Sequence, residues 1–241
     1  MKTEIIKLGS KESLGLYAAD LFAELSTEFI QSKGRFNVAL SGGSTPAVLY
    51  QKLVDLHSDD IYWNYIDFFW SDERYVPFDH ENSNGGLAFR RLLSPLEIEK
   101  ERYFPVLTTE HDPHYAALQY EQTLRRYFNA PTGVPSFDLI FLGLGDDGHT
   151  ASLFPGTKAL RESEKLVAAN WIDKFETWRI TFTYPLLNNA KKVIFLVSGP
   201  DKAKAAKSII KDGDRAFPAT LVKPHQGQLL WLLDEQAASE L

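Results

Sequence analysis

The stretch from Leu139 to Thr157 joins an apolar run to residues that can move a proton. Its first part, Leu139–Leu142, is typical of a strand buried on both faces of a parallel sheet. Polar groups that follow such a strand lie at the carboxyl edge of the sheet, where open α/β proteins bind ligands. Here the strand leads into glycines, two aspartates and a histidine. We interpret Asp147 and His149 as a reactive pair, in which the carboxylate fixes the imidazole tautomer and raises its basicity.

The glycines between Gly143 and Gly148 also match the GxGxxG spacing of dinucleotide-binding proteins. That motif requires a long helix whose first amides hold a pyrophosphate. Asp146 and Asp147 would instead bring negative charge to the phosphates, and Pro155 leaves little room for a helix. The sequence therefore argues against a nicotinamide, and we expect no cofactor.

A second glycine-rich loop lies between a predicted strand, Phe36–Leu40, and an apolar helical pattern. It consists of Ser41, Gly42, Gly43, Ser44, Thr45 and Pro46. The glycines let backbone amides approach a ligand, the hydroxyls add donors, and the helix N-terminus carries partial positive charge. We interpret this loop as a phosphate cradle. The alternative is an ordinary turn in which Ser44 or Thr45 caps the helix and Pro46 takes its first position.

Charged residues follow another predicted strand, Tyr65–Trp70. Asp72 could serve a sugar hydroxyl or a proton, and Arg74 could bind an anion. A solvated charged loop is the alternative. Arg179, at the start of a predicted strand, and Lys202, which follows Gly199, are further candidate phosphate cations. For Lys202 the local pattern alone favours a solvated helix face shared with Lys204 and Lys207.

A metal site built from Asp146, Asp147 and His149, with Asp72 or His80 added, would lack a dedicated ligand spacing. We therefore expect no metal. A serine nucleophile is not expected either, because the chain has no GxSxG elbow.

Strands and helices alternate along the chain, which predicts an α/β fold with a mostly parallel sheet covered on both faces. The predicted strands are Phe36–Leu40, Tyr65–Trp70, Tyr103–Val106, Leu139–Leu142, Leu166–Ala169, Arg179–Tyr184, Val193–Ser198 and Leu229–Leu233. The predicted helices run over about 10–33, 46–53, 86–93, 112–129 and 201–207, with a short one over 235–241. With no linker, repeat or low-complexity tract in sight, residues 1–241 are expected to form a single domain.

The composition limits the class of partner. Hydrophobic residues make up 44% of the 241 residues, enough for a sizeable core. The net charge of −6 argues against nucleic acid as the main partner, because phosphate-backbone binding needs a basic face. The absence of cysteine excludes disulfides and thiolate catalysis. No signal peptide or membrane span is evident, so we expect a cytoplasmic monomer or weak homo-oligomer that does not bind a membrane.

Several segments, in the same order along nearly the whole chain, resemble the 6-phosphogluconolactonases of the glucosamine-6-phosphate isomerase/6-phosphogluconolactonase family. They are Ser41–Pro46, Asp72–Arg74 with Val76–Pro77, Asn82–Asn84, Gly143–Gly156, Arg179–Thr183 with Asn189–Ala190, and Gly199–Ala203. The Asp-Gly-His-Thr-Ala-Ser-Leu-Phe-Pro block is highly specific, whereas Ser-Gly-Gly-Ser-Thr-Pro is shared more widely.

The resemblance implies a Rossmann-like fold of the glucosamine-6-phosphate isomerase and ribose-5-phosphate isomerase type. It also implies metal-free hydrolysis of 6-phospho-D-glucono-1,5-lactone to 6-phosphogluconate in the pentose phosphate pathway. His149 would handle the proton of the attacking water, and Gly145 would contact the substrate. The related deaminases carry a glutamate shortly after Asp-Gly-His, but residues 150–155 contain no acid. A sugar-phosphate isomerase or deaminase, or a non-catalytic sugar-phosphate sensor, remains the alternative.

Overall fold

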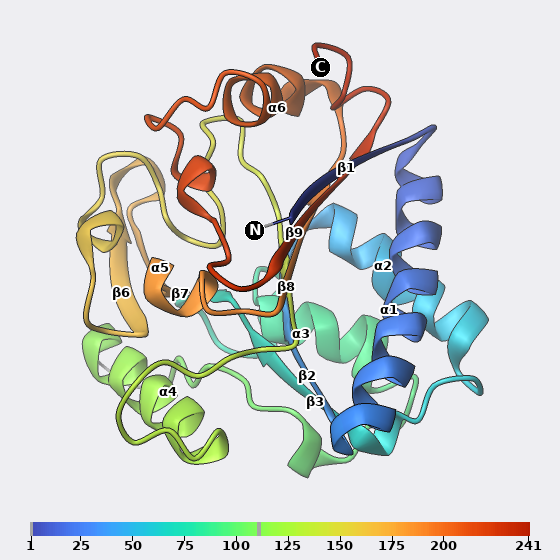
Figure 1. The fold of residues 1–241 in the computed structure, drawn as a ribbon. Helices are drawn as coiled ribbons and strands as arrows, with labels where there is room; N and C mark the ends of the chain where they lie inside the picture. Colours follow the sequence, from blue (N-terminus) through green and yellow to red (C-terminus); the bar gives the residue numbers. More distant parts are fainter. Residues whose placement is uncertain (1, 110–111) are drawn as a thin grey trace.

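A six-stranded parallel sheet forms the centre of the computed structural model, which describes residues 2–109 and 112–241 (Figure 1). The strand order is β1-β9-β8-β5-β2-β3, and every neighbouring pair is parallel. The strands are β1 (Lys2–Leu8), β2 (Phe36–Leu40), β3 (Ile66–Trp70), β5 (Leu139–Leu142), β8 (Lys192–Val197) and β9 (Gln228–Asp234). The predicted α/β class and parallel sheet are therefore confirmed.

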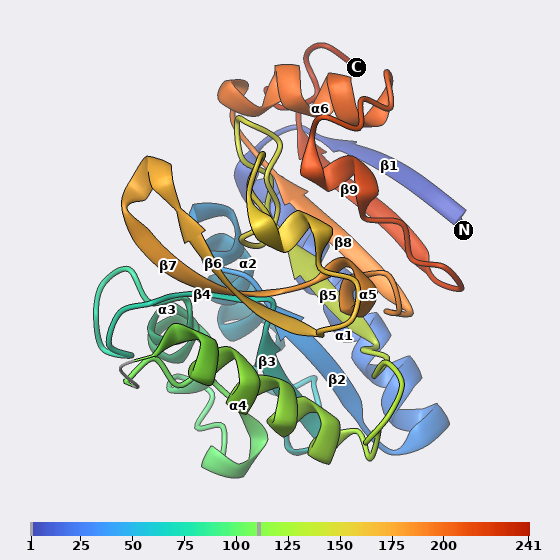
Figure 2. The same cartoon turned by 90° about the vertical axis from the view of Figure 1, so that its left-hand side faces the viewer.

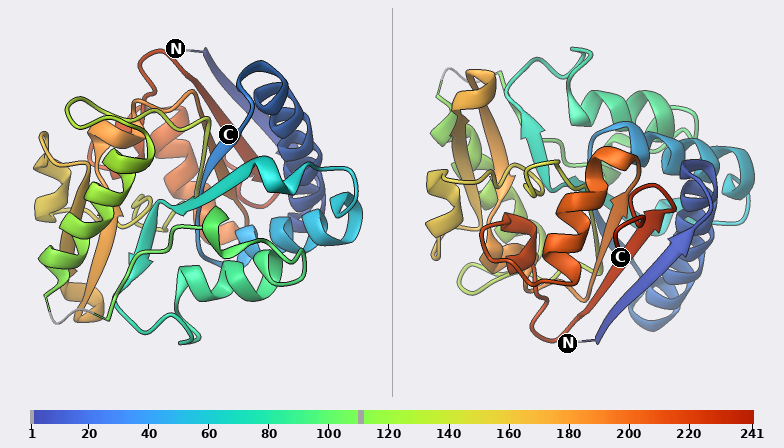
Figure 3. Two further views of the ribbon diagram at one scale, coloured as in Figure 1. Left: turned by 90° about the horizontal axis from the view of Figure 1, so that it is seen from below. Right: turned by 90° about the horizontal axis from the view of Figure 1, so that it is seen from above.

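Both faces of this sheet are buried because successive residues of its strands point into two different cores. In β5, Leu139 and Phe141 pack with α1 (Lys11–Lys33) and α2 (Ser44–His57). Ile140 and Leu142 face the opposite side, toward α4 (Pro113–Tyr127), α6 (Ala203–Ile210) and a second sheet. Burial on both faces is why the sequence of β5 is apolar throughout. Figure 3 shows α1 and α2 on one side and α4 on the other.

The second sheet has three antiparallel strands in the order β4-β7-β6, and sequence analysis did not predict it. These strands are β4 (Asp72–Arg74), β7 (Thr177–Phe182) and β6 (Val167–Ile172). Figure 2 shows α4 lying beside this sheet, in front of the parallel strands. Arg179 therefore lies in the middle of an antiparallel strand and faces Arg74 across the ladder, rather than at the entry of a parallel strand.

The remaining helical segments are short. They are α3 (Asn84–Ala88), a π-helical turn η2 (Phe89–Leu93), α5 (Tyr184–Leu187), and the 3-10 turns η1 (Trp63–Tyr65), η3 (Lys100–Arg102), η4 (Lys158–Arg161), η5 (Asp173–Phe175), η6 (Pro200–Lys202) and η7 (Pro218–Leu221). Among the helices over the described ranges, none has the length and apolar character needed to cross a membrane.

One strand was not predicted, and two local predictions were wrong. The first strand, β1, has an exposed, mixed sequence that gave no apolar signal and is held by its pairing with β9. Residues 103–106 make only an isolated bridge, between Tyr103 and Phe68. Residues 235–240 form successive turns where a terminal helix over 235–241 was predicted.

Candidate active site

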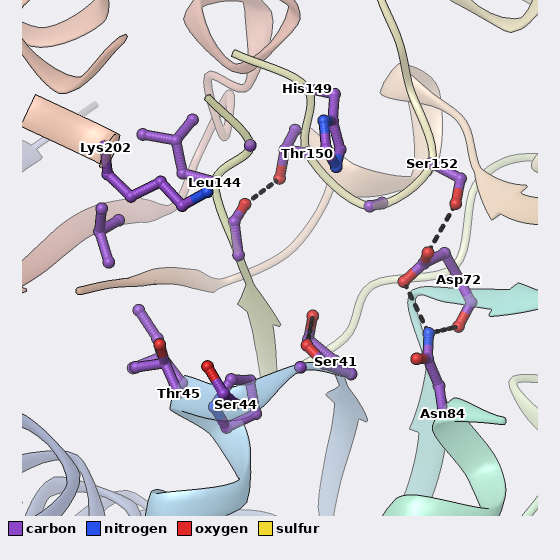
Figure 4. A pocket seen from close by; sticks show the side chains of 18 of the residues that line it. Ser41, Ser44, Thr45, Asp72, Asn84, Leu144, His149, Thr150, Ser152 and Lys202 are labelled. Carbon is purple, nitrogen blue, oxygen red and sulfur yellow. Dashed lines mark hydrogen bonds between the residues drawn. The ribbon is translucent and has the colours of Figure 1, made fainter. Parts of the chain in front are cut away.

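A cavity of about 440 Å³ lies where β2, β3, β5 and β8 deliver their carboxyl ends (Figure 4). Its lining brings together residues from segments far apart in the sequence: the Ser41–Pro46 loop, Asp72, Arg74, Asn84, residues 143–145, 149–152 and 154, Phe175, Arg179, residues 196–198, Asp201 and Lys202. Every predicted site residue except Asp147 therefore lines one cavity. Asp147 lies behind the imidazole of His149, on the lining of a neighbouring hollow.

The central feature of the cavity is the His149 side chain, which is held by Asp147. Nδ1 of His149 lies 2.5 Å from Oδ1 of Asp147, and the same oxygen accepts the His149 backbone N–H at 3.1 Å. Because an ionised carboxylate can only accept, Nδ1 carries the proton and Nε2 keeps its lone pair. Figure 4 shows the ring directed toward the open centre of the cavity. This geometry suits the pair to accept a proton at Nε2.

Asp147 stays ionised over the whole physiological range. Partial burial raises its pKa, but the hydrogen bonds and charge of His149, with a smaller contribution from Lys174, outweigh burial and lower the pKa to about 2. A carboxylate held in this form stabilises the imidazolium that appears when His149 takes a proton.

The loop that carries the pair has little conformational freedom. The backbone N–H of Gly145 donates to the carbonyl of His149 at 2.9 Å, and that of Gly148 donates to Gly145 at 3.0 Å. Gly148 has a positive φ of 75°, which suits glycine. Phe154 stacks on the imidazole with ring centroids 3.8 Å apart. A tight turn and an aromatic face together fix the plane of the ring.

The Ser41–Thr45 loop presents an uncapped helix N-terminus to the cavity. Gly43, with φ of 109°, takes the N-cap position of α2, and no side chain of the described residues caps the helix. The structure therefore contradicts the alternative in which Ser44 or Thr45 caps the helix and Pro46 takes its first position, because α2 begins at Ser44. The hydroxyl of Thr45 instead pairs with Ser198 at 2.8 Å. Uncapped N-terminal amides and hydroxyls are suited to an anion.

Asp72 is a buried carboxylate on the opposite wall, and both of its oxygens are engaged. Oδ2 accepts the Ser152 hydroxyl at 2.6 Å, and Oδ1 accepts the Asn84 amide at 3.2 Å. The Asn84 side chain also lies so close to Gly42 that a Cβ there would fall 1.7 Å from its Oδ1. Asn84 thus links Asp72 to the Ser41–Thr45 loop. Only a glycine at position 42 leaves room for the Asn84 side chain.

Glu73 does not line the cavity, although its sequence neighbours Asp72 and Arg74 do. Its carboxylate accepts the backbone N–H groups of Arg74, Asn84 and Gly85, each at 2.7 Å, and the Ser83 hydroxyl at 3.1 Å. Burial raises its pKa, and these donors oppose the rise. Glu73 therefore organises the start of α3.

The three candidate cations occupy two parts of the lining. The Nζ of Lys202 forms an ion pair with Asp201 at 2.8 Å, and in Figure 4 it reaches into the cavity across from Asp72. Arg74 and Arg179 lie beside Asp72, on the paired strands β4 and β7. Arg74 donates to the Asn82 carbonyl at 2.8 Å.

Sequence analysis did not identify four cavity residues that hold the candidate site residues in place: Asn84, Ser152, Phe154 and Ser198. Asn84 and Ser152 lay in segments quoted for the family resemblance, but only the fold shows that both bind Asp72. Over the two described ranges, no group of three His, Asp or Glu side chains is arranged to hold a metal ion.

Comparison with known proteins places the chain in one family. The family model described as glucosamine-6-phosphate isomerases/6-phosphogluconolactonase matches residues 9–231. The 6-phosphogluconolactonase of Nostoc sp. is 41% identical over 244 residues, covering 100% of this chain and 99% of the relative. The 6-phosphogluconolactonase of Rattus norvegicus is 40% identical, and the match covers 95% of this chain and 90% of the relative.

Solved structures of the same family have a similar fold. The 6-phosphogluconolactonase of Trypanosoma cruzi superposes with a TM-score of 0.90 at 29% identity, over 100% of this chain and 97% of that one. A monomeric glucosamine-6-phosphate deaminase superposes with a TM-score of 0.83 over 99% and 100%, but at 22% identity this shows the fold alone. On these matches, the chain belongs to the glucosamine-6-phosphate isomerase/6-phosphogluconolactonase family.

Proposed function

We propose that this protein hydrolyses 6-phospho-D-glucono-1,5-lactone to 6-phosphogluconate, a step of the pentose phosphate pathway. The observation that carries the proposal is the position of His149, oriented by ionised Asp147 in a cavity that also presents an uncapped helix N-terminus. The near full-length relatives at about 40% identity carry the same activity in their names. A base and an anion cradle in one cavity suit a substrate with a reactive carbonyl and a remote phosphate.

The chemistry begins with a water molecule at Nε2 of His149. The imidazole takes a proton from this water as its oxygen attacks the lactone carbonyl, and Asp147 stabilises the resulting imidazolium. The tetrahedral intermediate then collapses with cleavage of the bond to the ring oxygen, which gains a proton. Removing one base of this kind typically costs about 10²–10⁴-fold in rate.

The phosphate acts as a handle that positions the lactone. The amides and hydroxyls of the Ser41–Thr45 loop satisfy phosphate oxygens, and Lys202 balances the charge. Binding energy gained at this remote group holds the carbonyl near His149. In this arrangement Asp72, which is fixed by Ser152 and Asn84, is available to accept a hydroxyl of the substrate.

The cavity lining favours a lactonase over a deaminase. Among the described lining residues, the carboxylates are Asp72 and Asp201, and both are engaged by neighbouring side chains. Residues 150–155 supply hydroxyl, methyl and aromatic groups but no acid that could relay protons with His149.

The test is to assay the purified protein on freshly prepared 6-phosphogluconolactone and, in parallel, on glucosamine 6-phosphate. We expect lactone hydrolysis well above the spontaneous rate and no deamination or isomerisation. Turnover of glucosamine 6-phosphate would support the related deaminases, and binding of sugar phosphates without any turnover would support a sensor.

A further inference from the structure

Arg179 is a cavity residue whose donor groups remain unused. Within the described part of the chain, its guanidinium makes no hydrogen bond or ion pair, and its Nε is buried without a partner. Buried donors without partners are rare in native proteins and each requires an explanation. Arg179 is therefore positioned for something that is not part of the protein.

A second cation directly opposite makes the arrangement more unusual. Arg74 and Arg179 are paired residues on the antiparallel strands β4 and β7, and both line the cavity. Like charges at paired positions repel each other. Neither nearby carboxylate hydrogen-bonds Arg179: Asp72 accepts from Ser152 and Asn84, and Glu73 accepts from donors at the start of α3. An anion bound beside Arg179 would supply the missing acceptor and relieve the repulsion.

Two aromatic rings, Phe175 and Phe154, connect Arg179 to His149. Its guanidinium carbon is 5.8 Å from the ring centroid of Phe175, and the Phe175 ring is 5.9 Å from that of Phe154. Phe154 in turn stacks on His149 at 3.8 Å. Lys202 lies across the cavity from Asp72, the residue beside Arg179 (Figure 4). The cavity thus has one cationic part at Lys202 and a second one where Arg74 and Arg179 lie beside Asp72.

We propose that Arg179 stabilises the negative charge that hydrolysis creates at the carbonyl carbon, first as the oxyanion of the tetrahedral intermediate and then as the carboxylate of the product. This inference rests on the proposed lactonase function. In this proposal Arg179 does not bind the phosphate. Lys202 and the Ser41–Thr45 loop bind it.

The charges balance at each step. Water gives one proton to Nε2 of His149 and forms a C–O bond to the carbonyl carbon, whose oxygen becomes the oxyanion. The carbonyl reforms as the ring C–O bond breaks, and the ring oxygen takes the proton from His149. The new carboxylic acid loses its proton to solvent, so that a lactone and water become a hydroxy carboxylate and a proton. A guanidinium beside this carbon meets both anions with preorganised donors.

The kinetic test compares Arg179→Gln and Arg179→Lys with wild type on the phosphorylated lactone and on unphosphorylated gluconolactone. We expect Arg179→Gln to lower kcat about 10²–10³-fold, the usual effect of losing an oxyanion donor, with little change in KM. Both lactones should lose kcat/KM equally, and Arg179→Lys should recover part of the loss. Arg91→Ala, an exposed arginine outside the cavity, is the matched control.

A binding measurement separates this role from a structural one. The probes are 6-phosphogluconate and glucitol 6-phosphate, which differ in that the second has an alcohol in place of the carboxylate. Arg179→Gln should lower the affinity for 6-phosphogluconate by roughly 10–100-fold, as expected for losing a hydrogen bond between charged groups. The affinity for glucitol 6-phosphate should stay unchanged. Equal weakening of both, or a kinetic loss confined to the phosphorylated lactone, would overturn the proposal. If wild type fails to hydrolyse the lactone, the proposed function fails, and the binding comparison still decides whether Arg179 holds a carboxylate.

Discussion

Gly145 lies directly against the imidazole of His149. A Cβ on residue 145 would fall 2.0 Å from Nδ1 and 2.2 Å from Cε1 of the ring, and 2.7 Å from Oδ1 of Asp147. Real Cβ atoms essentially never come within 3.0 Å of another heavy atom. The ring and its carboxylate therefore occupy space that only a glycine leaves open, and the geometry of the base depends on this position.

Gly145→Ala should displace the imidazole and lower kcat by about 10²-fold or more while the fold stays intact, because misplacing a catalytic group by about 1 Å has an effect of that size. Gly9→Ala is the matched control, since Gly9 lies outside the cavity lining and a Cβ there would meet no atom of the described residues within 4 Å. The measurement is lactonase kcat with circular dichroism of both variants. Equal activity of the two variants would show that Gly145 does not position the ring.

Asp147→Asn should lower the free energy of unfolding and change how this free energy depends on pH. The pKa of Asp147 is lowered to about 2 from 3.8, so the ionised group stabilises the folded state above about pH 4 and loses this effect as the pH falls toward 2. The difference in the free energy of unfolding between wild type and Asp147→Asn should therefore shrink between about pH 5 and pH 2.5. Urea unfolding at both pH values measures it, and a difference that stays constant would contradict the assigned pair.

Lys202→Ala should raise KM for the phosphorylated lactone and reduce discrimination against unphosphorylated gluconolactone. The physical reason is that amides and hydroxyls satisfy phosphate oxygens but leave the charge only partly balanced. Lys204→Ala is the control, because Lys204 is exposed on the following helix, α6, and lies outside the cavity lining. The comparison is kcat/KM for both lactones. Equal losses on the two would show that Lys202 does not read the phosphate.

The parts of the site that sequence could predict are those carried by local pattern. Apolar strands such as Leu139–Leu142 are visible as continuous runs because both of their faces are buried. The loops that follow them contain glycines and ionisable groups, and the rule that strand ends gather at one edge brings them together. His149 and the Ser41–Thr45 loop were found in this way, whereas Lys202 depended on the family resemblance, and the structure places all three in one cavity.

The parts that sequence could not predict depend on contacts between distant segments. Strand β4 has only three residues, all polar, and becomes a strand because β7, about 105 residues later, pairs with it. The same is true of Ser152, whose hydroxyl binds Asp72 across 80 residues of sequence. The pairing of Arg74 with Arg179 follows from this second sheet, so that the unusual position of Arg179 appears only in three dimensions.

The most direct test of the account is the lactonase kcat of His149→Ala, measured beside wild type and the exposed control His225→Ala on fresh 6-phosphogluconolactone. The account predicts that His149→Ala folds normally and loses about 10²–10⁴-fold in kcat, while His225→Ala keeps wild-type turnover. If folded His149→Ala retained turnover within a few-fold of wild type, His149 would not be the base and the proposed mechanism would be wrong.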